Sequence, residues 1–202
     1  MISQLGLGGA KGHVLDLAGD QVARGSQVGV LGLREGANKP AAYRQALEER
    51  GVSVFVPTTW WQRLRYSPGH YFWLIRRIRD FRPDVIHTHL PAADIAVSCL
   101  NNQFGRKVPL VGTLHGWEPR YANMLNRRLL GVAYRRFDAL LSVSRWLKDV
   151  MVAIGAPEAA ISVVYHGIDD ANPDPESSKF IRAELLENFG SAERVIVGTV
   201  GR

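Results

Sequence analysis

The stretch GLGGAKG, Gly6–Gly12, stands between a short apolar start at Ile2 and a helical pattern in which Val14 and Ala18 recur at four-residue spacing. Glycines at a strand-to-helix turn let backbone N–H groups approach a phosphate, and the helix dipole adds attraction for negative charge. Taken alone the signal is weak, because glycine-rich turns also occur for purely steric reasons. The turn nevertheless predicts a first strand, a first helix and an anion site between them.

One alternative for this turn is a nicotinamide dinucleotide site. Gly6, Gly8 and Gly12 have a suggestive spacing, but the strict G-x-G-x-x-G pattern fails because Lys11 stands at its last position. The sequence also contains no Tyr-x-x-x-Lys pair of the kind that serves short-chain dehydrogenases. An NAD(P)-dependent Rossmann oxidoreductase is therefore the weaker interpretation.

Short apolar, β-branched runs alternate with helical patterns almost throughout the chain. Most of these runs are apolar without alternation, as expected for strands whose sheet is covered on both faces. Strand–helix alternation implies parallel strands joined by right-handed crossovers, so the predicted fold is α/β, a Rossmann-like doubly wound parallel sheet. The predicted strands are 27–31, 52–56, 84–88, 109–114, 139–143 and 161–165, and the predicted helices include 40–50, 74–81, 92–103, 122–137 and 145–154.

The regular pattern breaks after Tyr165. Residues 166–178, HGIDDANPDPESS, are rich in turn formers and predict a linker. Residues 180–189 look like a helix and 195–200 like a strand, which has no obvious partner here although strands need partners. We therefore expect a first domain over 1–165, a hinge over 166–178 and the truncated start of a second domain over 179–202.

The front of the chain is also short of a strand. Only Ile2, Ser3 and Gln4 precede the glycine turn, yet the first strand of a doubly wound sheet normally lies centrally. An abbreviated central strand leaves the hydrogen-bonding edges of its neighbours unpaired. The alternatives are an unusually short strand or, as we favour, a segment upstream of residue 1.

The composition is that of an ordinary globular domain, with 46% hydrophobic and 22% charged residues. No apolar run approaches the ~20 residues that cross a bilayer, and the N-terminus has no secretion signal. A single cysteine, Cys99, excludes an intramolecular disulfide and fits a reducing compartment. We expect a cytoplasmic protein in which Cys99 fills the core, because it has helical spacing with Ile95 and Ala96.

The net charge of +6 is concentrated in two arginine-rich clusters, which predict an anionic partner such as phosphates or lipid headgroups. Solvated helix faces explain any single arginine equally well, and we expect no nucleic-acid partner. The first cluster comprises Arg63, Arg65, Arg76, Arg77, Arg79 and Arg82, and the second Arg120, Arg127, Arg128, Arg135, Arg136, Arg145 and Lys148.

Between residues 58 and 81 the arginines are interleaved with aromatic side chains. This mixture suits a membrane interface, where aromatic rings lie at headgroup level and arginines meet anionic lipid. The alternative is that the aromatic side chains cap the core and shape a pocket. The aromatic residues are Trp60, Trp61, Tyr66, Tyr71, Phe72 and Trp73.

Histidines follow two successive predicted strands at their carboxyl ends. In DVIHTHLPAAD, His87 and His89 share one face at the strand end, where open α/β sheets bind ligands. A His-x-His pair can hold a metal, but no nearby set of carboxylates and histidines completes a ligand sphere, so we expect no metal. The other alternative is that His87 is a buried, hydrogen-bonded histidine that closes the strand.

The next predicted strand gives VGTLHGWE and places His115 at its carboxyl end. A histidine there can hydrogen-bond a sugar hydroxyl or stabilise developing positive charge, and burial in the core is again the alternative. Trp117 either stacks on a sugar ring or packs against the following helix.

Six ordered segments together resemble the family 4 GT-B glycosyltransferases over essentially the whole chain. They are GLGGAKGHVLDLA, PDVIHTH, VGTLHGWE, DALLSVSRWLKDVMV, ISVVYHGID and VIVGTVGR. The resemblance implies two Rossmann-like domains that face each other across a cleft. The first mainly receives the acceptor and the second mainly binds the nucleotide sugar, so this chain is expected to be the acceptor-side half and inactive alone.

The resemblance also implies site residues. Gly8 and Gly9 match the glycine pair that contacts the donor diphosphate, and His115 matches the active-site histidine that contacts the transferred sugar. Arg202 matches an arginine that binds donor phosphates from the second domain. The positions expected beside the acceptor cleft are His87, His89, Trp117, Ser144 and Arg145.

Two positions depart from the family pattern: Lys11 stands where glutamate is common, and His166 where the hinge usually has asparagine, a change expected to matter little. The family implies a retaining reaction without metal or cofactor, in which the donor phosphate takes the acceptor proton and backbone N–H groups and cations stabilise the leaving diphosphate. The expected function is transfer of a sugar from a nucleotide-sugar donor to a glycan or glycolipid, with a non-catalytic sugar-binding module as a further alternative.

Overall fold

The computed structural model describes residues 1–58, 67–100, 103, 108–117, 123–167, 179–180 and 183–184. The chain divides into two compact units, Met1–His166 and Gly167–Arg202. In the second unit, residues 179–180 and 183–184 are helical, while the strand predicted at 195–200 and Arg202 lie outside the described residues. The hinge and the second domain therefore stay predictions.

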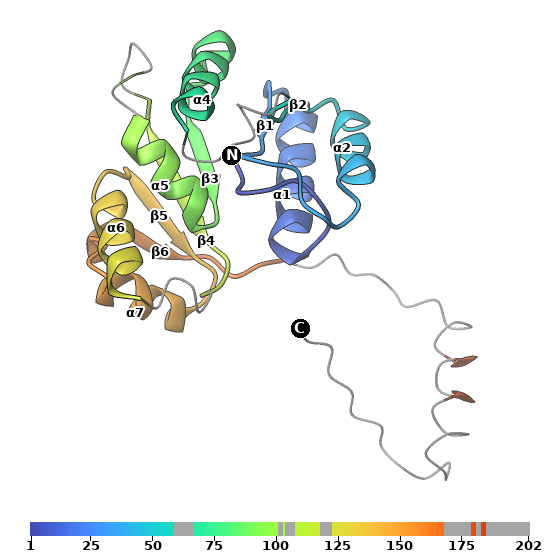
Figure 1. The fold of residues 1–202 in the computed structure, drawn as a ribbon. Coiled ribbons are helices and arrows are strands. Elements are labelled where there is room, and N and C mark those ends of the chain that lie inside the picture. Colours follow the sequence, from blue (N-terminus) through green and yellow to red (C-terminus); the bar gives the residue numbers. More distant parts are fainter. Residues whose placement is uncertain are drawn as a thin grey trace. The chain divides into compact units, whose positions relative to one another are not determined.

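The first unit is an α/β fold built on parallel strands (Figure 1). Four strands pair in the order β3 (Ile86–His89), β4 (Leu110–Leu114), β5 (Ala139–Ser142) and β6 (Ile161–Val163), and each pair is parallel. Two further parallel strands, β1 (Gly29–Leu31) and β2 (Ser53–Phe55), form a separate pair. The predicted α/β class with parallel strands is confirmed, and the strands are shorter than the apolar runs that predicted them.

Helices connect the strands, as the alternating pattern predicted. Three of them end at glycines with positive φ, namely Gly25 (φ 88°), Gly51 (φ 76°) and Gly155 (φ 100°), a conformation that side chains with a Cβ rarely adopt. The helices are α1 (Gly9–Ala23), α2 (Pro40–Glu48), α4 (Pro68–Phe81), α5 (Pro91–Leu100), α6 (Met124–Tyr134) and α7 (Arg145–Ala153), with a 3₁₀ turn at Glu158–Ala160.

Met1 and Ile2 join the two sets of strands. The Ile2 N–H donates to the Leu31 carbonyl (2.9 Å), and the Ile2 carbonyl accepts from the Leu33 N–H (3.0 Å). On the other side the His89 N–H donates to the Met1 carbonyl (2.9 Å). This short segment therefore lies between β1 and β3, the central position predicted for the first strand.

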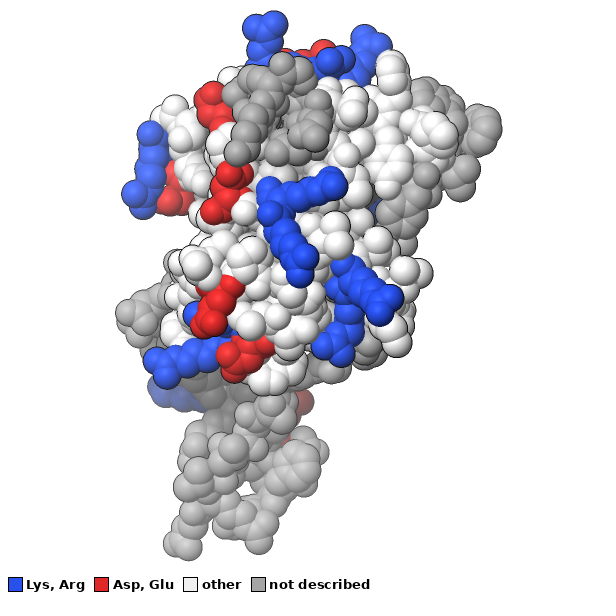
Figure 2. Space-filling model, turned by 90° about the vertical axis from the view of Figure 1, so that its left-hand side faces the viewer, with Lys and Arg blue, Asp and Glu red and all other residues white. Residues whose placement is uncertain are grey.

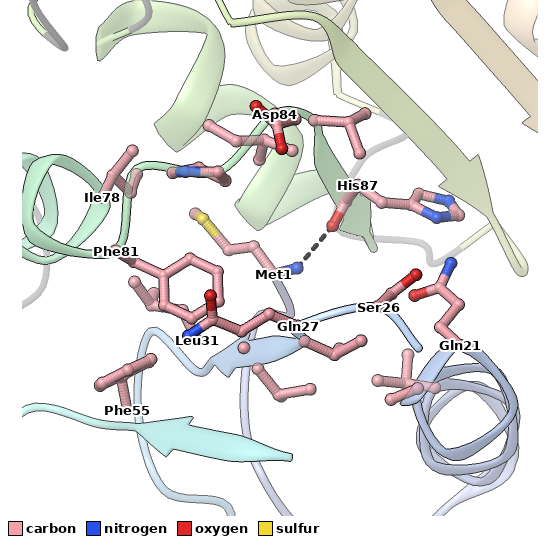
Figure 3. A pocket seen from close by; sticks show the side chains of 18 of the residues that line it. Met1, Gln21, Ser26, Gln27, Leu31, Phe55, Ile78, Phe81, Asp84 and His87 are labelled. Atoms are coloured by element: carbon pink, nitrogen blue, oxygen red, sulfur yellow. Dashed lines mark hydrogen bonds between the residues drawn. The ribbon is translucent and has the colours of Figure 1, made fainter. Parts of the chain in front are cut away.

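A cavity of about 600 Å³ lies beside Met1, between the β1 and β3 sides of the fold. Its wall includes Val30, Phe55, Phe81 and Ile86. Figure 3 shows the Met1 amine at this cavity, donating to the His87 carbonyl. Among the described residues, backbone pairing joins β1 to the β3 side at Met1 and Ile2 only, and the cavity lies along the remainder of the boundary between the two sets of strands.

Two apolar clusters hold the first unit together. The larger one lies around the four-stranded sheet and includes Leu110, Leu114 and Leu140 of the strands. The smaller one includes Ile2, Leu5 and Val30, beside α1 and α2. Burial of apolar side chains from both helices and strands is the main stabilising contribution in such a layered fold.

The prediction that Cys99 fills the core is wrong, because its side chain is exposed. The buried face of α5 carries Ala92, Ala93, Ala96 and Val97. Cys99 follows Ile95 by four residues, and Ile95 is itself only half-buried. Because α5 is apolar on almost every side, its sequence does not indicate which side faces the core.

Candidate active site

The carboxyl ends of β3 and β4 bring the predicted histidines together. The strands are parallel neighbours in a register that pairs His87 with Val111 and His89 with Thr113. His115 follows β4 directly, so its ring extends from the same edge of the sheet as His89. The expectation that these three histidines share one site is consistent with their arrangement.

Two more histidines reach this edge from distant parts of the chain. His13 comes from α1, and His166 follows β6 at the end of the first unit. The ring of His13 lies 5.3 Å from that of His115 and 4.3 Å from that of His166, measured between ring centroids. We call the resulting group the histidine cluster; its members are His13, His87, His89, His115 and His166.

Nitrogen–nitrogen contacts link four of these rings in series. His89 Nδ1 lies 2.9 Å from His115 Nε2, and His115 Nδ1 lies 3.1 Å from His166 Nε2. His166 Nδ1 then lies 3.1 Å from His13 Nδ1. In addition, the His115 and His166 rings are nearly parallel, at 13° and 5.0 Å between centroids. The four rings therefore form one hydrogen-bonded series rather than independent contacts.

Burial keeps the inner histidines neutral at physiological pH. Desolvation, followed by the neighbouring N-terminal amine and His13, lowers the pKa of His87 to about 4. Desolvation, followed by His13 and His166, lowers the pKa of His115 to about 3. The pKa values of His89 and His13 are also lowered, in both cases mainly by desolvation. Neutral imidazoles offer one N–H donor and one acceptor each, which suits sugar hydroxyls.

The glycine turn lies one helical turn away from His13. Gly8, with φ 154°, is the N-cap of α1, and its carbonyl accepts from the N–H groups of Lys11 (3.0 Å) and Gly12 (2.8 Å). The N–H groups of Gly9 and Ala10 donate to no group among the described residues. Such free donors at a helix start can bind an anion such as a phosphate, and the predicted anion site at this turn stays a prediction.

Two of the other predicted site residues have structural partners. The Ser144 side chain caps α7 by accepting from the Leu147 N–H (3.2 Å), and the exposed Arg145 begins that helix. Trp117 is half-buried and packs against the larger apolar cluster. Their roles in binding an acceptor stay predictions.

His87 is also tied into the fold, because its Nε2 lies 2.7 Å from the Thr113 hydroxyl. This contact fits the alternative of a hydrogen-bonded histidine that closes the strand. Among the described residues, no group of three or more His, Cys, Asp or Glu side chains is arranged to hold a metal ion. The nitrogen–nitrogen contacts within the histidine cluster join His89 to His115, His115 to His166 and His166 to His13.

His13 and His166 were not assigned to the site from sequence. His13 follows Gly9 by four residues, which places both on one side of α1, next to the predicted anion site. His166 follows the last strand, again at a carboxyl end. A search for every histidine at a strand end or in the helix after the glycine turn would have found both.

Comparison with known proteins assigns the chain to a family. The sequence profile described as Glycosyltransferase Family 4 matches residues 7–172. No curated protein matches the chain.

In the part of the chain that the structure describes, no helix has both the length and the apolar character needed to span a membrane.

The solved structures similar to this chain share its fold at low sequence identity. HepE from Anabaena, in complex with UDP, has a TM-score of 0.70 at 21% identity, with 91% of this chain and 48% of HepE covered. The apo form of the lipopolysaccharide outer core galactosyltransferase WaaB has a TM-score of 0.61 at 14% identity, with 87% and 48% covered.

A glycosyltransferase from Rickettsia africae ESF-5 has a TM-score of 0.60 at 16% identity, with 91% and 48% covered. The chain thus spans about half the length of the solved structures it matches. The profile match covers most of the chain, the fold is that of the N-terminal halves of GT-B glycosyltransferases, and the chain belongs to glycosyltransferase family 4.

Proposed function

We propose that this chain is the acceptor-side half of a retaining glycosyltransferase that transfers a hexose from a nucleotide sugar to a glycan or glycolipid. The observation that carries the proposal is the histidine cluster at the carboxyl edge of the sheet, one helical turn from the free N–H groups of Gly9 and Ala10. A sugar and a phosphate are the two parts of a nucleotide-sugar donor, and this site offers neutral hydrogen-bonding rings for one and backbone donors for the other.

The donor diphosphate is proposed to lie against the start of α1. Gly9 leaves room there, since a Cβ added at Gly9 would meet no atom within 4 Å. Arg202, outside the described residues, is proposed to add a positive charge from the second domain. In complexes of HepE, the ligands are UDP and UDP-glucose, which supports a nucleotide-sugar donor of that class for this chain.

The proposed sugar transfer needs no nucleophile from the protein. The acceptor hydroxyl attacks the sugar carbon on the side from which the diphosphate leaves, and the departing phosphate takes the hydroxyl proton. The N–H donors at the start of α1 stabilise the negative charge that builds up on the leaving group. His115 is proposed to contact the transferred sugar, with His87, His89, Trp117, Ser144 and Arg145 beside the acceptor.

The experiment is a transfer assay on the full-length protein with a panel of nucleotide sugars, followed by NMR of the anomeric configuration of the product. We expect transfer from one donor with retention of configuration, and no transfer by residues 1–202 alone. An inverted product would refute the retaining mechanism. Full turnover by residues 1–202 would refute the division of the active site between two domains.

We further propose that the protein is cytoplasmic and that a membrane surface is its second contact. The helices α4 and α6 both expose apolar side chains beside arginines. In Figure 2 the Lys and Arg side chains lie in separate groups, with some Asp and Glu side chains nearby. Within residues 58–81, Phe72 is 61% exposed whereas Trp73 is buried. This stretch therefore contributes aromatic side chains both to the surface and to the core. The exposed set on α6 is Met124, Leu125, Leu129 and Val132, next to Arg127 and Arg128.

The aromatic pair Trp60 and Trp61, outside the described residues, provides the test of this contact. Replacing both with alanine should weaken sedimentation with liposomes of anionic lipid at least tenfold, because interfacial tryptophans contribute strongly to such binding. Sedimentation that is unchanged by the substitutions and insensitive to salt would contradict the proposal. Gln45→Ala, at a surface position on α2, is the matched control.

A further inference from the structure

The rings of His89, His115, His166 and His13 form what we call the imidazole chain. Each of its three contacts is 2.9–3.1 Å between ring nitrogens, which is hydrogen-bond distance. A hydrogen bond between two imidazoles needs an N–H on one ring and a lone pair on the other. The positions of the protons along the chain are therefore linked.

The two middle rings decide how many proton arrangements exist. His115 and His166 each use both of their nitrogens inside the chain. A neutral ring carries one N–H, so each of these two must donate on one side and accept on the other. When all four rings are neutral, only two arrangements satisfy all three hydrogen bonds, and they differ by a concerted shift of every shared proton.

The two arrangements give His13 opposite roles at its free nitrogen. In the first, His13 Nδ1 donates to His166, so Nε2 is a bare lone pair. In the second, His13 Nδ1 accepts from His166, so Nε2 carries the proton. Neither nitrogen of His115 or His166 is left over in either arrangement, whereas His13 Nε2 has no hydrogen-bond partner among the described residues.

We propose that His13 is a further substrate-contacting residue, and that its Nε2 is the nitrogen that the imidazole chain presents to the nucleotide-sugar donor. The position supports this role, because His13 is half-exposed and follows Gly9 by four residues on the same side of α1. As an acceptor, Nε2 binds a sugar hydroxyl; as a donor, it binds a phosphate oxygen. This inference rests on the proposed glycosyltransferase function and adds a residue to its donor site.

The test uses two substitutions that each keep one nitrogen position of the ring. Asparagine places its amide near the position of Nδ1 and can keep the contact with His166, whereas glutamine reaches the position of Nε2. In the full-length enzyme, we expect His13→Asn and His13→Ala to raise the KM for the nucleotide sugar at least tenfold. His13→Gln should stay within about threefold of the original enzyme, because its amide both donates and accepts at the outer position.

A measurement without turnover separates this inference from the proposed function. Full-length protein labelled with ¹⁵N-histidine is titrated with UDP, and the His13 Nε2 resonance is expected to shift in proportion to bound UDP. A shift accompanied by no transfer activity would leave the His13 contact standing and overturn only the enzyme assignment. Transfer that is unaffected by His13→Ala, or equal effects of the asparagine and glutamine variants, would overturn the role of His13.

Discussion

Lowering the pH from 6.5 to 5.5 should reduce the free energy of unfolding of residues 1–202 by about 2–3 kcal/mol. The pKa values of His87 and His115 are lowered to about 4 and about 3, and that of the buried His89 is lowered as well. An unfolded histidine binds its proton near pH 6.5, but these three stay neutral in the folded state. The unfolded state thus binds more protons than the folded state across this window, and the free energy of unfolding decreases as the pH falls.

Stability falls with falling pH because the pKa values of these histidines are lower in the folded state than in the unfolded state. A histidine whose folded pKa is lowered gives its full contribution to stability above pH 6.5 and loses it as the pH falls below that value. Each such histidine costs about 1 kcal/mol over the first pH unit. Two other buried groups act in the same window and largely cancel, since the pKa of the Met1 amine is lowered to about 5 and that of Asp94 is raised to about 7.

Urea unfolding at half-unit steps from pH 7.5 to pH 5.5 measures this dependence, and the slope gives the number of protons taken up. His115→Asn should remove about one proton from that number, because it deletes one of the three neutral rings. A stability that is flat across the range would contradict the burial of the histidine cluster. So would a slope that His115→Asn leaves unchanged.

Replacing Asp94 with asparagine should raise the free energy of unfolding by about 3 kcal/mol at pH 8. Asp94 is 1% exposed in the first turn of α5, and its Oδ2 accepts from the Tyr134 hydroxyl (3.2 Å). Desolvation raises its pKa to about 7, although the neighbouring Thr88 and Tyr134 hydroxyls and the Met1 amine oppose the rise. Asparagine keeps an acceptor for Tyr134 without a charge to bury.

The gain from this substitution should depend on pH. The folded state holds the carboxyl proton up to about pH 7, so ionisation costs stability only above the pKa of the unfolded chain. The difference between the two proteins should therefore be small at pH 4, grow between pH 4 and pH 7, and level off above. Thermal unfolding at pH 4, 6 and 8 measures it, with Asp149→Asn on the exposed side of α7 as the control. A loss of stability at pH 8 would show that the carboxylate is needed there.

The sequence patterns predicted the fold well because its strands are short apolar runs and its helices end at glycines. Runs buried on both faces indicate parallel strands, and the glycines that directly follow three of the helices, Gly25, Gly51 and Gly155, all have a positive φ. The boundaries were less accurate, since apolar residues that flank a strand pack in the core without joining the ladder. Val52, for example, is buried but lies outside β2.

The strand pattern predicted only those residues of the candidate site that lie at the ends of neighbouring strands. His87, His89 and His115 follow from the strand pattern, because the carboxyl ends of adjacent parallel strands meet at one edge. The contact between His166 and His13 joins residues 153 positions apart and depends on where the end of β6 passes α1. No local spacing encodes such a contact. His166, at the position where the replacement of the family's asparagine was expected to matter little, has its ring stacked on that of His115.

We propose that the histidine cluster is the sugar-facing part of a glycosyltransferase site. The most direct test compares sugar transfer by the full-length enzyme with that of its His115→Ala variant at saturating donor and acceptor. We expect kcat to fall at least tenfold in the variant, while Gln45→Ala on the surface of α2 leaves kcat unchanged. Equal kcat values for the original enzyme and the His115→Ala variant would contradict it.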